Sequence, residues 1–140
     1  MILRSFLRMV AFGVVLAAII VASANAETRE RRIASYCSPS GDVCFGIFAR
    51  NREVLLRIST AAHYFSRYML CVRGSASGAS GLLRCGSFPV FRQCGSTWGS
   101  TVRYGRQYPG TEPGVYRVTW KLNAKPLGPT LRFRLPLRRH

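Results

Sequence analysis

Apolar and polar residues alternate along much of the chain after residue 40, which is the pattern of half-buried β-strands. In residues 115–122, VYRVTWKL, one set of alternate positions is Tyr, Val, Trp and Leu, and the other carries Arg, Thr and Lys. In residues 130–135, TLRFRL, Leu and Phe alternate with two arginines. Neither run has the spacing of a helix, so both are predicted to be strands with one buried face.

Five further runs continue this pattern, and turn residues separate them at intervals of about ten positions. They cover residues 43–50, 54–60, 64–73, 82–92 and 98–106. The fourth contains Pro89, which cannot donate to a sheet ladder, so it is expected to be an edge or bulged strand. The seven runs predict an all-β fold: a seven-stranded antiparallel two-sheet sandwich, stapled by disulfides. Its predicted core comprises Val43, Phe45, Ile47, Val54, Leu56, Ile58, Tyr68, Leu70, Val72, Tyr116, Val118, Trp120, Leu131, Phe133 and Leu135.

The first 26 residues have the order of a secretory signal peptide. Arg4 and Arg8 precede an apolar run at residues 9–21, and an Ala-Asn-Ala cleavage site ends at Ala26. The alternative is an uncleaved anchor, but the run is shorter than the roughly 20 residues that span a bilayer. We therefore expect a secreted, extracytoplasmic protein. The predicted organisation is a signal peptide at 1–26, a basic tail at 27–36, one β-sandwich domain at 37–135 and a basic tail at 136–140.

Five cysteines lie beyond the predicted signal, and an oxidising compartment favours disulfides between them. In an antiparallel hairpin, the residue numbers of every facing pair add up to the same total, which we call the index sum. A sum of 156 makes Cys71 face Cys85 and centres the turn on Gly78, in the middle of GSASGASG. A Cys71–Cys85 disulfide would fix a register that this loop composition cannot set. The same sum places Tyr68 opposite Phe88 and Leu70 opposite Gly86, and it also sets Val72 against Arg84, a mismatched pair beside the loop.

The second predicted disulfide joins Cys37 to Cys44 across a Ser-Pro-Ser-Gly-Asp turn. Cys94 is left over, as a free thiol, an intermolecular link, or the true partner of Cys85. No Cys-x-x-Cys motif and no Cys/His cluster with zinc spacing occurs, so we predict neither a metal site nor a cofactor.

Residues 113–120, PGVYRVTW, resemble the sixth strand of the immunoglobulin-like and fibronectin type III-like β-sandwich superfold. In those domains a tyrosine that follows a turn bonds back to the upstream backbone, and the resemblance assigns this role to Tyr116. It also implies that residues 64–73, 115–122 and 130–135 share one sheet, with 115–122 in the middle. The chain lacks the cysteines that antibody-type domains carry in the second and sixth strands, and the resemblance implies no function.

The chain is strongly basic, with a formal net charge of +16. Beyond residue 26 it retains 19 of its 21 Lys and Arg residues and all five acids, for a net charge of +14, and 17 of the 19 are Arg. Arginine pairs bidentately with phosphate and carboxylate, so polyanions are the natural class of partner. Genomic codon bias is the alternative explanation for this enrichment.

Period-two alternation places six cations on the outer face of that one sheet. They are Arg67, Arg73, Arg117, Lys121, Arg132 and Arg134. We interpret them as a binding face for a nucleic acid, an anionic polysaccharide or an anionic envelope surface. The alternative is an ordinary solvated sheet face. Few aromatic residues share this face, so base stacking and sequence-specific nucleic-acid recognition are not expected.

Enzymatic activity is the less favoured interpretation. His63 is the weak catalytic candidate, for a small hydrolase acting on a polyanion such as RNA, with Glu53 as a conceivable partner. Acid–base catalysis needs two positioned groups, and the spacing demands no such pair. A third interpretation is a cationic effector that perturbs envelopes. The favoured prediction is a secreted, basic, non-enzymatic binding module whose oligomeric state the sequence leaves open.

Overall fold

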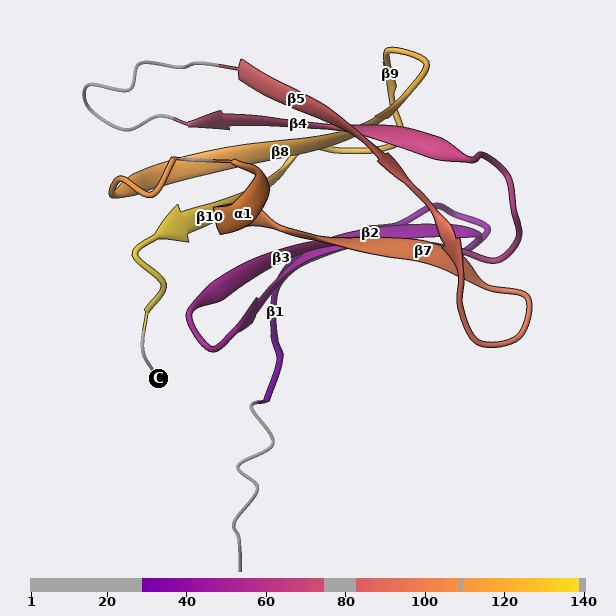
Figure 1. The fold of residues 1–140 in the computed structure, drawn as a ribbon, viewed down its shortest axis with the longest axis horizontal. Helices are drawn as coiled ribbons and strands as arrows, with labels where there is room; N and C mark the ends of the chain where they lie inside the picture. Colours follow the sequence, from indigo (N-terminus) through magenta and orange to yellow (C-terminus); the bar gives the residue numbers. More distant parts are fainter. Residues whose placement is uncertain (1–28, 75–82, 109, 139–140) are drawn as a thin grey trace, which may run out of the picture.

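The computed structural model describes residues 29–74, 83–108 and 110–138, and in them two antiparallel sheets pack face to face (Figure 1). This confirms the predicted all-β, two-sheet, disulfide-stapled class. The described residues form ten strands rather than seven, together with one short helix, α1 (Tyr104–Gln107), where a strand was predicted to run on to residue 106. The predicted signal peptide at 1–26 lies outside the described residues.

The first sheet has the strand order β1-β2-β3-β7-β6, and the second has the order β10-β8-β4-β5 with β9 beside β8. The strands of the first sheet are β1 (Arg31–Cys37), β2 (Val43–Arg50), β3 (Glu53–Thr60), β6 (Phe91–Arg92) and β7 (Trp98–Arg103). Those of the second are β4 (Arg67–Gly74), β5 (Leu83–Pro89), β8 (Gly114–Leu122), β9 (Lys125–Pro126) and β10 (Leu131–Leu135).

Most of the predicted N-terminal tail is a strand. Residues 31–37 form β1, which pairs with β2 at the edge of the first sheet. A register shift between Arg32 and Ala34 interrupts the alternation of this strand, so its sequence does not show period two. Arginines at such an edge also discourage pairing with another chain. The predicted C-terminal tail is likewise not free at its start, because Leu137 packs against the core.

Pro89 marks the point at which the chain changes sheets. β5 is an edge strand of the second sheet and ends at Pro89, and β6 then pairs with β7 in the first sheet. The predicted single run 82–92 is therefore two strands. Its predicted edge position is confirmed. The Val90 amide still donates to the Ser66 carbonyl at 3.0 Å, so the edge strand tolerates a proline that has no amide hydrogen of its own.

The β4–β5 register agrees with the predicted index sum. Cys71 faces Cys85, and the facing pairs Tyr68–Phe88, Leu70–Gly86 and Val72–Arg84 are all present. Disulfides join Cys71 to Cys85 and Cys37 to Cys44, each across a directly opposed pair of strand residues. Cys94 is a free, exposed thiol. Both staples therefore fix the register of a hairpin.

The core lies between the two sheets. Trp120 of the second sheet is fully buried and stacks on Phe45 of the first, with ring centroids 4.6 Å apart. Of the predicted core residues, Val43, Leu131 and Leu135 are only partly buried, because they stand at strand ends. Tyr108 was not predicted, and its hydroxyl donates a 2.6 Å hydrogen bond to the Leu70 carbonyl.

A polar link between the two sheets joins the hydroxyls of Tyr68 on β4 and Ser100 on β7 at 2.6 Å in the buried interior. Burial raises the pKa of Tyr68 to about 12. The pKa values of Tyr104 and Tyr108 are also raised, in each case mainly by burial. These tyrosines therefore stay neutral across the physiological pH range.

Candidate binding site: a basic face on the second sheet

The structure brings the six predicted binding residues onto the outer side of the second sheet. β8 lies between β4 and β10, as the resemblance implied, so the cations of these three strands share one surface. Lys121 is half-buried, and the other five are exposed. We refer to these six residues, Arg67, Arg73, Arg117, Lys121, Arg132 and Arg134, as the basic face.

Three of these arginines form a row across three neighbouring strands. Arg117 on β8 is directly opposite Arg73 on β4, and on its other side it is directly opposite Arg132 on β10. Neighbouring strands lie about 4.8 Å apart, so the backbone positions of the row span about 10 Å. Arg134 extends the cations along β10, two residues beyond Arg132. The sequence predicted the face but not this alignment.

No acidic residue pairs with the row. Within the described residues the ion pairs are Arg57–Glu30 and Arg103–Glu53, and both lie on the first sheet. Like charges directly opposite each other on a sheet destabilise it, by up to about 1 kcal/mol. The row therefore brings like charges together, and no acid of the described residues forms an ion pair with them.

The rest of the basic face is more constrained. Arg67 donates hydrogen bonds to the hydroxyl and the carbonyl oxygen of Ser87 on β5, at 3.1 and 2.9 Å. Next to the arginine row lies a neutral row that contains the Cys71–Cys85 disulfide and Thr119, whose hydroxyl is 2.8 Å from that of Thr130. The hydroxyl pair links β8 to the residue before β10, and both of these strands carry arginines of the row, whereas the disulfide fixes β4 to its other neighbour, β5.

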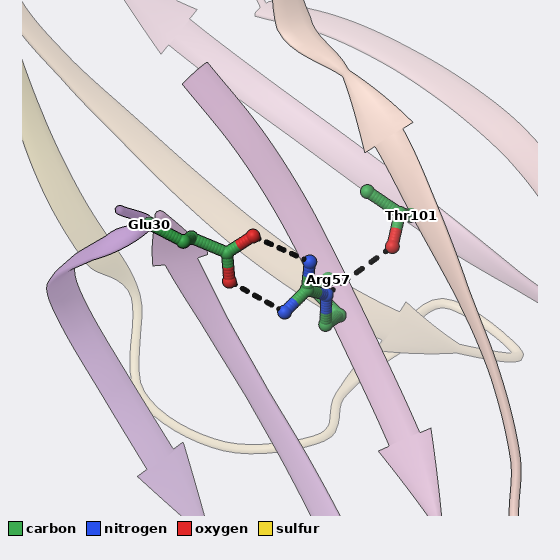
Figure 2. Close-up of polar contacts among 3 residues, drawn as sticks. All are labelled: Glu30, Arg57 and Thr101. Atoms are coloured by element: carbon green, nitrogen blue, oxygen red, sulfur yellow. Dashed lines mark hydrogen bonds and ion pairs between the residues drawn. The ribbon is translucent and has the colours of Figure 1, made fainter. Parts of the chain in front are cut away.

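The outer side of the first sheet is organised differently. Arg57 donates hydrogen bonds at 2.7 and 2.9 Å to the two carboxylate oxygens of Glu30, and a third to the hydroxyl of Thr101 (Figure 2). The guanidinium also lies 4.9 Å from the centre of the Phe48 ring. These hydrogen bonds, opposed by partial burial, keep the pKa of Glu30 below its ordinary value of 4.5. Arg57 is thus occupied, unlike the arginines of the row.

The weak catalytic candidates are not brought together. His63 is exposed, follows β3, and stacks on Trp98 with ring centroids 3.9 Å apart. Glu53 is the first residue of β3, so the length of that strand separates it from His63 by roughly 20 Å or more. Its carboxylate instead lies 3.6 Å from Arg103.

The described residues contain no group of three or more His, Cys, Asp and Glu side chains that could hold a metal ion. In the same part of the chain, no helix has the length and apolar character needed to cross a membrane. The two disulfides fit an extracytoplasmic location.

No protein-family model, no curated protein and no solved structure gives a significant match to this chain. The hydrogen bond expected of Tyr116 is present, since its hydroxyl donates to the Glu112 carbonyl at 2.6 Å. The resemblance to the immunoglobulin-like and fibronectin type III-like superfold itself stays a prediction.

Proposed function

We propose that this protein is a secreted, non-enzymatic β-sandwich module that binds linear polyanions through the basic face. The observation that carries this proposal is the row Arg73–Arg117–Arg132, in which like charges oppose one another without an acidic partner in the described structure. Guanidinium groups bind phosphate and sulfate oxygens bidentately, so such a row suits a polymer with a regularly repeated anion.

The composition of the face favours binding that does not depend on sequence. The residues opposed in register around the row include threonine, methionine and the disulfide, and none is a base-stacking aromatic. Affinity therefore depends on charge, and it falls as salt rises because bound counterions are released on association. Nucleic acids and sulfated polysaccharides are expected to compete for the same face.

Export of the protein rests on two features. The first 26 residues have the order of a signal peptide, and the two disulfides need an oxidising compartment. The polymer that the protein meets is therefore an extracytoplasmic one.

The test compares two variants with the same loss of charge. Arg117→Ser/Arg132→Ser removes two members of the row, whereas Arg92→Ser/Arg106→Ser removes two exposed arginines outside the basic face. Binding of a labelled single-stranded (dT) oligomer is measured by fluorescence anisotropy at low salt. We expect the first variant to bind at least about tenfold more weakly and the second to stay within about threefold of the unmodified protein. Equal losses would show that only net charge matters and would refute the proposal.

A further inference from the structure

A second basic cluster lies where β1 begins, where β2 turns into β3, and where the C-terminal segment passes. Two of its arginines, Arg31 and Arg138, also line a small pocket with Arg134, so the cluster adjoins the end of the basic face. The cluster lines a cleft of about 680 Å³. Six arginines line this cleft, namely Arg29, Arg31, Arg32, Arg50, Arg52 and Arg138, and we refer to it as the basic cleft. Its other lining residues are Glu30, Ala49, Asn51 and Leu137.

Glu30 is the acid among the described residues that line the basic cleft, and it already pairs with an arginine that does not line the cleft. Both carboxylate oxygens of Glu30 accept hydrogen bonds from Arg57, which does not line the cleft. Arg50 is near enough to contribute to the lowered pKa of Glu30 but forms no ion pair with it. None of the six arginines has an ion-pair partner among the residues that the structure describes. The cleft therefore holds a high density of positive charge that no ion pair among the described residues neutralises.

One lining residue of the cleft has a backbone conformation that arginine rarely adopts. Asn51 and Arg52 are the central residues of the β2–β3 turn, with φ angles of 51° and 65°. Two positive φ angles define the hairpin turn in which Asn-Gly is strongly preferred, because glycine has no steric penalty there. Arginine at this second position is strained. The turn thus places Arg52 at the cleft in a backbone conformation that lowers local stability.

We propose that the basic cleft binds a compact anion that carries several phosphate groups. Six arginines line one small volume, and a singly charged ligand would leave most of their charge unneutralised. The volume lies within the ordinary range for small-molecule sites. None of the described residues that line the cleft is aromatic, so the phosphate groups rather than an attached ring provide the affinity. The cleft contains none of the three arginines of the row, Arg73, Arg117 and Arg132, and the inference does not rest on the function proposed above.

The hairpin turns supply a matched pair of variants. Ala124 has the same φ of 65° in the Asn123–Ala124 turn between β8 and β9, and it does not line the cleft. Arg52→Gly and Ala124→Gly each relieve the same backbone strain, so each is expected to raise the melting temperature by about a few degrees. Only Arg52→Gly removes a cation from the cleft.

The experiment titrates inorganic tripolyphosphate into the disulfide-bonded protein by calorimetry at low salt. We expect binding by the unmodified protein and by Ala124→Gly with equal affinity, about three- to fivefold weaker binding by Arg52→Gly, and at least about tenfold weaker binding by Arg52→Gly/Arg138→Ser. The row variant Arg117→Ser/Arg132→Ser is expected to bind tripolyphosphate with unchanged affinity. The affinity for a nucleoside triphosphate is expected to be within about threefold of that for tripolyphosphate, because no described lining residue is an aromatic on which the base could stack.

Three results would overturn the proposal. The first is no detectable binding of tripolyphosphate by the unmodified protein. The second is unchanged affinity in the Arg52→Gly/Arg138→Ser variant. The third is loss of binding in the row variant, which would place the anion on the basic face. A tenfold preference for the nucleoside triphosphate would contradict recognition by phosphate groups alone.

Discussion

Arg117 on β8 and Arg73 on β4 face each other across two neighbouring antiparallel strands, and no acid of the described residues pairs with either. Arg132 on β10 repeats this relationship on the other side of Arg117. A sheet selected only for stability would place opposite charges or neutral β-formers at such positions. Under the proposed function, a bound anion offsets this repulsion.

Replacing the central arginine of the row should improve folding and weaken binding at the same time. We expect Arg117→Thr to raise the free energy of unfolding by about 0.2–1 kcal/mol, because it removes two cross-strand repulsions and introduces a good β-former. Urea denaturation measures this change, and anisotropy measures the weaker binding of a polyanion. Arg67→Thr is the control, because Arg67 faces Pro89 and donates to Ser87, so its loss should not stabilise the protein.

The Glu30–Arg57 pair should make stability depend on acidic pH. The folded-state pKa of Glu30 is below its ordinary value of 4.5, so the unfolded chain takes up a proton first as the pH falls. The stabilisation is therefore complete above about pH 4.5 and is lost as the pH falls through the lower folded value. Thermal melts of Glu30→Gln should show a loss of about 1 kcal/mol at pH 7 that disappears at strongly acidic pH.

The matched control for this prediction is Glu53→Gln. Glu53 makes a single contact with Arg103 at 3.6 Å, whereas Glu30 receives two shorter hydrogen bonds. Its replacement should cost less at pH 7. A larger loss for Glu53→Gln, or a loss for Glu30→Gln that does not change with pH, would contradict the role assigned to Glu30.

The strands and the β4–β5 register could be predicted from the sequence, because each depends on residues that are close together in the chain. Alternation located the strands from β2 to β5, together with β7, β8 and β10, and the index sum of the β4–β5 hairpin predicted its register and its disulfide. Alternation also predicted which cations lie on the outer side of the second sheet. These inferences need only the two-residue period of a strand and the geometry of a hairpin.

Features that depend on distant pairing were not predictable in the same way. The bulge near Arg32 breaks the alternation of β1, so that strand was interpreted as a tail. The alignment of Arg73 with Arg117 needs the register between β4 and β8, which are far apart in the chain. The basic cleft needs three separate segments to meet, and no local pattern encodes that meeting.

The buried tyrosines should make the protein sensitive to alkali. The pKa of Tyr68 is raised to about 12, mainly by burial, so the unfolded chain ionises first as the pH rises. The stability from this group is fully present below its ordinary pKa of 10 and is lost as the pH rises towards 12. Urea melts at pH 9, 10 and 11 should show falling stability, and Tyr68→Phe should fall less steeply. An equal fall in both proteins would contradict the prediction.

Tyr116 should contribute through its hydroxyl as well as its ring. The 2.6 Å hydrogen bond that it donates to the Glu112 carbonyl anchors the loop before β8. Tyr116→Phe is expected to lower the free energy of unfolding by about 0.5–1.5 kcal/mol in urea denaturation. Tyr36→Phe serves as the control, because ring contact with Phe45 is its recorded interaction and should survive the change. Equal effects in the two variants would argue against the anchoring bond.

The salt dependence of polyanion binding tests the central claim most directly. Affinity for a single-stranded oligonucleotide is measured from low to moderate salt for the unmodified protein and for Arg73→Ser/Arg117→Ser/Arg132→Ser. Each phosphate contact contributes about 0.7 to the slope of log affinity against log salt, so removing the row should reduce the slope by about 2. If the row binds the polyanion, the variant will show a shallower slope together with much weaker binding. An unchanged slope and affinity would contradict the central claim.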